Sequence, residues 1–234
     1  MVCSTIREIL LETEKKYGAE DAIRYKVGKN EIEAKSYTQL KEDSESFSGV
    51  LESLGELGGH IAITGRTSYP WLVSFFGIVN SGSVAVPLDM SLPAAELCEL
   101  IDRADVTVLV LDEVRADVAA AAKENCPKLK YIISMQKEEH GQELLSFWKL
   151  LEEEKSGEQE REIQKEVFSY SPEPDQLCTI MFTSGTTGKS CAFVSAAYPP
   201  RLLSEPGYFK RYVLRGSNLY QRFPPSGGKK YQAF

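Results

Sequence analysis

The strongest constraint on the fold is a series of short apolar segments that lack any polar alternation. A strand with apolar residues on both faces is buried on both faces, as in parallel sheets covered by helices. Each segment is too short for a helix of typical length. They lie at residues 61–63, 84–87, 106–111, 131–133 and 177–182. We therefore expect an α/β fold, with a mixed or parallel sheet layered with helices.

The segments between these strands have apolar residues at helical spacing. A capping box of Thr5 and Glu8 opens the first helix, and Gly18 can end it. Two predicted strands then flank the turn Gly28-Lys29-Asn30, which indicates a hairpin. Further helices are predicted around Leu40 to Leu54 and at 71–79, 94–104, 116–125 and 144–155, and a charged stretch follows at 152–164.

Composition excludes several classes of function. The net charge of −7 gives no electrostatic basis for binding nucleic acid or an anionic membrane. Five widely spaced cysteines without a C-x-x-C pattern indicate reduced thiols and argue against zinc. His60 and His140 are far apart, so a histidine-based catalytic centre has little support. The start of the chain lacks the features of a signal peptide, and the apolar stretch 71–88 fits a helix and a strand better than a membrane span. We expect a cytoplasmic protein.

The composition changes abruptly near Cys191. Residues 1–190 carry a charge of −13, whereas residues 191–234 carry +6. The second segment also holds five of the eleven prolines and nine aromatic residues, without a clear helical or strand period. We interpret 191–234 as a non-family tail that is disordered or frame-shifted, and a genuine basic tail is the alternative.

One short segment carries chemistry. Its glycines let the backbone turn several N–H groups to one side, its hydroxyls can donate to phosphate oxygens, and its lysine adds a positive charge. It lacks the first glycine of a Walker P-loop, because Thr183 stands there. An ordinary connecting loop is the alternative. The segment follows the last apolar strand and reads Thr183-Ser184-Gly185-Thr186-Thr187-Gly188-Lys189.

These seven consecutive residues resemble the phosphate-loop signature of the adenylate-forming ligases, which include acyl-CoA synthetases, luciferases and peptide-synthetase adenylation domains. Upstream segments are also similar to that family, namely 36–40, 71–89 and 91–97. The resemblance covers about residues 1–190 and implies the amino-terminal part of an AMP-binding domain that ends at the phosphate loop. Residues Thr183 to Lys189 would then hold the β- and γ-phosphates of ATP.

The resemblance implies a two-step reaction. A carboxylate oxygen attacks the α-phosphorus of ATP to give acyl-AMP and pyrophosphate, and the thiol of coenzyme A then displaces AMP. The family uses Mg²⁺, and its other motifs are aromatic-Gly-x-Thr-Glu for the metal, Thr-Gly-Asp for the ribose and a carboxy-terminal lysine. None of these motifs occurs here, and Glu205 is the only acid after Lys189. The sequence therefore identifies no catalytic residue and no metal ligand, and we expect this chain alone to be inactive.

The sequence leads to three hypotheses about function. The leading one is a fragment of an AMP-forming acyl-CoA synthetase, an acid–thiol ligase, and the charged helical segment before Asp175 favours the long-chain fatty acid–CoA ligase group. The second is another adenylating enzyme, such as a peptide-synthetase adenylation domain. The third is a non-catalytic fragment that binds nucleotide or a protein partner.

Overall fold

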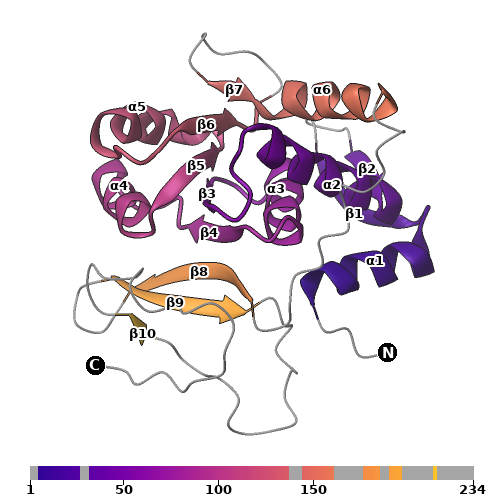
Figure 1. Cartoon of the computed structure of the whole chain (residues 1–234), viewed down its shortest axis with the longest axis horizontal. Helices are drawn as coiled ribbons and strands as arrows, with labels where there is room; N and C mark the ends of the chain where they lie inside the picture. The colour runs from indigo at the N-terminus through magenta and orange to yellow at the C-terminus, as the bar shows by residue number, and fades with distance from the viewer. Residues whose placement is uncertain are drawn as a thin grey trace, which may run out of the picture.

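The computed structural model describes residues 5–26, 32–136, 144–160, 176–184, 190–196 and 213–214. Its centre is an eight-stranded sheet with the order β10-β9-β8-β4-β3-β5-β6-β7 (Figure 1). The strands from β4 to β7 run parallel and β8 runs parallel to β4, whereas β9 and β10 join as antiparallel partners. The strands are β3 (His60–Thr64), β4 (Val84–Leu88), β5 (Val106–Leu111), β6 (Tyr131–Ser134), β7 (Leu145–Ser146), β8 (Leu177–Ser184), β9 (Ser190–Ala196) and β10 (Val213–Leu214).

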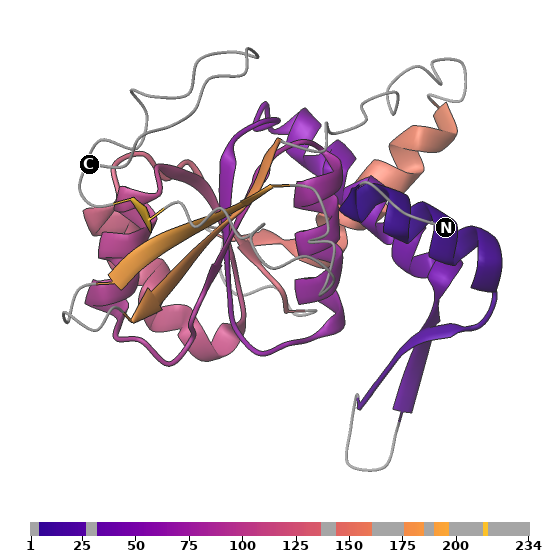
Figure 2. The ribbon, with the colours of Figure 1, turned by 90° about the horizontal axis from the view of Figure 1, so that it is seen from below.

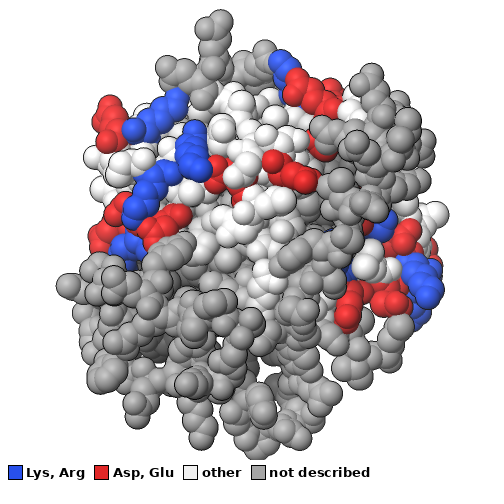
Figure 3. Space-filling model, viewed as in Figure 1, with Lys and Arg blue, Asp and Glu red and all other residues white. Residues whose placement is uncertain are grey.

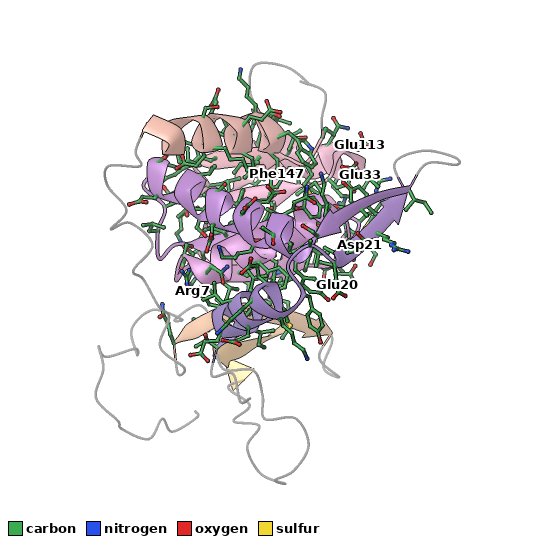
Figure 4. All side chains as sticks on the ribbon, turned by 90° about the vertical axis from the view of Figure 1, so that its right-hand side faces the viewer. Arg7, Glu20, Asp21, Glu33, Glu113 and Phe147 are labelled. Atoms are coloured by element: carbon green, nitrogen blue, oxygen red, sulfur yellow. The ribbon has the colours of Figure 1, made fainter. Side chains whose placement is uncertain are left out.

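Helices cover both faces of this sheet. One apolar core is built with side chains from α1, α2, α3 and α6, and a second core is built with side chains from α4 and α5. Figures 1 and 4 show α6 lying along α2, and the ring of Phe147 is buried between them against Phe47, at 5.5 Å between ring centroids. The helices are α1 (Ile6–Tyr17), α2 (Tyr37–Ser53), α3 (Tyr69–Asn80), α4 (Ala94–Arg103), α5 (Ala116–Asn125) and α6 (Phe147–Glu160).

The central strands supply both cores by simple alternation. In β3, the side chains of Ile61 and Ile63 enter the first core and that of Ala62 enters the second. In β5, Val108 and Val110 face the first core, and Leu109 faces the second. An uninterrupted apolar run is therefore what a strand between two helical layers requires.

A separate antiparallel hairpin stands beside this body. Strands β1 (Asp21–Lys26) and β2 (Ile32–Ser36) pair with each other, and Figure 2 shows the hairpin extending away from the sheet. Ser36 then caps α2 through a complete capping box with Gln39. The predicted hairpin is confirmed, and its predicted turn at 28–30 lies outside the described residues.

Helices α2 and α3 approach each other closely because α3 carries a glycine at the contact. A Cβ atom on Gly77 would lie 2.8 Å from the carbonyl oxygen of Ser44 and 2.9 Å from Cβ of Phe47. The Ser48 hydroxyl donates to the Gly77 carbonyl at 2.8 Å across the same contact. This helix pair borders the first core, so its spacing sets how the sheet is covered.

The predicted α/β fold class is confirmed, with local differences in the bounds of its elements. The last helix begins at Phe147 rather than 144, because Leu145 and Ser146 pair with β6, and it continues to Glu160. Strands β9 (Ser190–Ala196) and β10 (Val213–Leu214) lie in the segment 191–234 or run into it, although its sequence predicts no helix or strand. Among the described residues, none of the helices combines the length and the apolar character needed to cross a membrane.

Candidate functional site

The predicted phosphate loop leaves the sheet at the end of β8. Thr183 and Ser184 are the last residues of that strand, and Ser184 is paired with Ser190 of β9. The structure gives the backbone of Thr183 and Ser184 but not their side chains. The other five predicted binding residues, Gly185, Thr186, Thr187, Gly188 and Lys189, lie outside the described residues.

The position of β8 puts this loop at a particular edge of the sheet. β8 runs parallel to β4, with Ala85 paired to Thr179, so Thr183 and Ser184 extend just past the level at which β4 ends with Leu88. Ligands of open α/β sheets bind outside the carboxyl ends of the strands. The predicted loop therefore starts from the edge where a phosphate site is expected.

The connection between β4 and α4 follows the strand that neighbours β8, and a buried arginine holds this connection in place. Arg115 is only 8% exposed, and its guanidinium donates to the carbonyl oxygens of Met90 and Leu92, the latter at 2.8 Å. The carboxylate of Asp117 pairs with the same guanidinium at 2.9 Å, and this hydrogen bond raises the pKa of Arg115. The Arg115 guanidinium thus holds the backbone of the β4–α4 connection in place beside β8.

A second polar cluster lies at the carboxyl ends of β3 and β5, the neighbouring strands between which the strand order reverses. Asp112 follows β5 directly, and its carboxylate accepts from Nε and Nη2 of Arg66 at 2.7 and 2.9 Å. It also accepts from the backbone N–H groups of Arg66 and Val114. Burial alone would raise the pKa of Asp112, but these hydrogen bonds and the Arg66 charge outweigh it and lower the pKa.

Close backbone approach makes this cluster possible. Gly65 has φ +142°, and a Cβ atom there would lie 2.3 Å from Cβ of Asp112. Arg66 also pairs with Glu113 at 3.1 Å, so two acids face one guanidinium. The cluster consequently adds no net positive charge to the edge. On the face drawn in Figure 3, described basic side chains likewise lie next to acidic ones.

The described part of the chain does not identify a magnesium ligand. It contains no group of three or more His, Cys, Asp or Glu side chains that could hold a metal ion. Mg²⁺ in nucleotide sites is bound by one or two carboxylates together with substrate phosphates. Asp112 is committed to Arg66, and the hydrogen bonds that Asp89 accepts from Ser91 lower the pKa of its carboxyl. No described residue is therefore assigned as a magnesium ligand.

Comparison with known proteins identifies the family. The pattern of the family described as AMP-binding enzyme matches residues 11–190. The chain belongs to the AMP-binding enzyme family. The match ends directly after the predicted phosphate loop, which supports the resemblance drawn from that motif and from the upstream segments.

Individual relatives are distant. The chain is 25% identical over 166 residues to a 3-[(3aS,4S,7aS)-7a-methyl-1,5-dioxo-octahydro-1H-inden-4-yl]propanoyl:CoA ligase of Rhodococcus jostii, covering 69% of the chain and 32% of the relative. It is 28% identical over 189 residues to a long-chain-fatty-acid–CoA ligase of Xenopus laevis, covering 79% and 25%. The chain thus spans about a third or less of the length of these curated relatives.

Solved structures agree on the fold. An anthranilate CoA ligase in complex with anthranoyl-AMP matches with a TM-score of 0.69 at 19% identity, over 82% of this chain and 35% of that one. A fatty acyl CoA synthetase of Mycobacterium tuberculosis matches with a TM-score of 0.63 at 18% identity, over 83% and 35%. At this identity the likeness establishes a shared architecture and nothing finer.

Sequence reasoning missed the polar residues that organise this edge. Arg66 and Asp112 are 46 residues apart in sequence, and Arg115 reaches a carbonyl 25 residues earlier. A signal was present, because Asp112 comes directly after a buried strand, at the edge where polar groups of an α/β sheet gather. The residue with which each charged side chain pairs could not be predicted without the strand order.

Proposed function

We propose that this chain carries the phosphate-binding part of an AMP-forming acyl-CoA synthetase, in which residues 183–189 hold the β- and γ-phosphates of ATP. The carrying observation is the seven-residue Thr/Ser/Gly/Lys motif that begins with the last two residues of β8, at the carboxyl edge of the sheet. Family membership over residues 11–190 supports the same assignment. Mg²⁺ would accompany ATP, with ligands supplied by parts of the family's fold that these residues do not include.

The chemistry of the proposed enzyme is acyl activation followed by thioester formation. Backbone N–H groups and the Lys189 charge would neutralise the pyrophosphate as it leaves the α-phosphorus. Coenzyme A would then take the acyl group. Relatives named as long-chain-fatty-acid–CoA ligases, at 28% and 30% identity, favour a fatty acid as the acyl substrate.

A second adenylating chemistry has some support of its own. A D-alanine–D-alanyl carrier protein ligase of Streptococcus equi is 32% identical over 83 residues, which is 35% of this chain. Such an enzyme would share the phosphate loop and differ in its acyl pocket. Binding of nucleotide therefore tests what the two proposals share, and the choice of acid separates them.

The test is calorimetric titration of the chain with ATP and Mg²⁺. We expect measurable binding, and Lys189→Ala should weaken it by roughly 10- to 150-fold, because a charge-assisted contact contributes about 1.5–3 kcal/mol. Lys128→Ala is the matched control, since Lys128 pairs with Asp105 at the amino end of β5, on the opposite edge of the sheet. Unchanged affinity in Lys189→Ala, or no binding by the unaltered chain, would refute the assignment of the loop.

The chain alone should not form an adenylate, because the metal and ribose motifs of the family do not occur in its sequence. Carboxylate-dependent exchange of labelled pyrophosphate into ATP is the direct assay. Exchange above a blank without acid would show that this expectation is wrong, and comparing a fatty acid with D-alanine would then identify the substrate class.

A further inference from the structure

The second helical layer contains two cysteines in direct contact. Cys98 lies in α4 and Cys126 follows α5 directly, 28 residues later. Both are nearly inaccessible, at 6% and 4% exposure. The Cys126 thiol donates to the backbone carbonyl oxygen of Cys98, with 3.6 Å between sulfur and oxygen. A disulfide requires two Cβ atoms about 3.5–4.5 Å apart, so two buried cysteines already in contact are a pair that can be tested for one.

A cavity makes the pair asymmetric. A hollow of about 330 Å³ between the two helices is lined by Ala95, Cys98, Glu99, Asp102 and Asn125. Cys98 contributes to its wall and Cys126 does not. The two acidic side chains disfavour an anionic reagent in this space. A small, uncharged reagent is therefore the kind that can reach the first sulfur.

We propose that Cys98 and Cys126 form a thiol modification site that reacts with a small uncharged peroxide and closes to a disulfide between α4 and the end of α5. This inference is independent of the proposed function, because it concerns the opposite helical layer from α2 and α3 and does not involve the phosphate loop.

The reaction balances in two steps. The deprotonated Cys98 sulfur attacks one oxygen of hydrogen peroxide, the O–O bond breaks, and the departing hydroxide takes up a proton to become water, leaving a sulfenic acid on Cys98. The Cys126 sulfur then attacks the Cys98 sulfur, the S–O bond breaks, and the hydroxyl leaves as a second water with the Cys126 proton. Two thiols and one peroxide give one disulfide and two waters.

The electrostatics agree with this order of events. Burial raises the pKa of the Cys126 thiol to about 12, and its neighbour Cys98 adds to the shift. Burial thus favours the protonated form of Cys126, and access assigns the first attack to Cys98, the cysteine on the cavity wall. Cys126 acts second, on the side chain of the residue whose backbone carbonyl its own thiol already contacts.

The experiment exposes the whole chain to hydrogen peroxide and maps its peptides by mass spectrometry. We expect the loss of two hydrogens and a linked peptide pair containing Cys98 and Cys126, reversed by dithiothreitol. Oxidised glutathione, which is anionic, should give the same product more slowly. A linkage through Cys178 or another cysteine, or both thiols remaining open to alkylation after denaturation, would overturn the proposal.

Single variants test the order of attack. In Cys126→Ser the sulfenic acid has no second thiol, so dimedone should label Cys98. In Cys98→Ser dimedone should not label Cys126, because that thiol does not line the cavity. Circular dichroism checks that both variants are folded, and the peptide map of the unaltered chain decides the question without them. Dimedone on Cys126 in place of Cys98 would contradict the assigned roles.

Discussion

Asp112→Asn should lower stability at neutral pH, and by progressively less as the pH falls below about 4. The Asp112 side chain is 9% exposed, and its carboxylate accepts four hydrogen bonds, two of them from the Arg66 guanidinium at 2.7 and 2.9 Å. An asparagine has one acceptor oxygen, so its NH₂ group must face N–H donors whichever way it is turned. Charge-assisted bonds contribute about 1.5–3 kcal/mol each, but Arg66 is 57% exposed and partly screened. We expect a loss of about 2 kcal/mol at neutral pH.

The sign of the pH dependence follows from the lowered pKa of Asp112. A carboxyl whose pKa is lower in the folded state stabilises the protein above its unfolded pKa of about 4, and this stabilisation is lost as the pH falls through the folded pKa. Protonated Asp112 then resembles the asparagine variant. The difference between the two proteins should shrink progressively as the pH falls below about 4.

Urea unfolding followed by circular dichroism, in a series from about pH 7 to pH 3, measures this difference. Glu113→Gln is the matched control, because Glu113 is 48% exposed and makes one contact with the same arginine at 3.1 Å. It should change stability by less than about 0.5 kcal/mol. An Asp112→Asn loss that stays constant across the series would refute the electrostatic reasoning.

Two further substitutions test the first core. Gly77→Ala should destabilise the protein by about 1–3 kcal/mol, because its methyl group would meet the backbone of α2 at 2.8 Å. Its control is Gly157→Ala in α6, which has open space around it and should stabilise the protein by about 0.5–1 kcal/mol. Thermal unfolding compares the two variants, and equal effects would contradict the packing argument. Tyr69→Phe should cost about 1.5–3 kcal/mol in urea unfolding, because the fully buried Tyr69 hydroxyl donates to the carboxylate of Asp43 at 2.5 Å; an unchanged unfolding midpoint would contradict it.

Much of the fold could be predicted because a strand that is buried on both faces has an uninterrupted apolar sequence. The run from Val106 to Leu111 has no polar side chain except Thr107, and the structure buries its residues in two separate cores. Helix ends marked by a cap were equally legible, as with Thr5, whose hydroxyl accepts from the Glu8 N–H at 3.1 Å. These signals are local, so they do not depend on knowing the topology.

The strand order and the polar pairs across it could not be predicted, because they depend on which strands become neighbours. β8 adds to the sheet beside β4, a strand that ends 89 residues before it begins in sequence. The phosphate motif itself was identified through resemblance, and its residues Gly185 to Lys189 remain a prediction. Local physics indicated a phosphate-compatible loop, but only the strand order places that loop at the carboxyl edge.

The boundary at residue 190 remains a prediction, and β9 sharpens how it can be tested. The predicted boundary is based on charge and proline content. Strand pairing depends instead on hydrogen bonding, because an exposed strand edge has backbone N–H and C=O groups without partners. The edge of β8 pairs with residues 190–196, and the first proline of the segment, Pro199, comes only after that strand ends. Limited proteolysis with mass spectrometry separates the two views. If 191–234 is foreign to the fold, the protected fragment should end near residue 190. A fragment that ends after Ala196 would mean that β9 belongs to the sheet in solution, and protection extending through residue 234 would refute the predicted tail altogether.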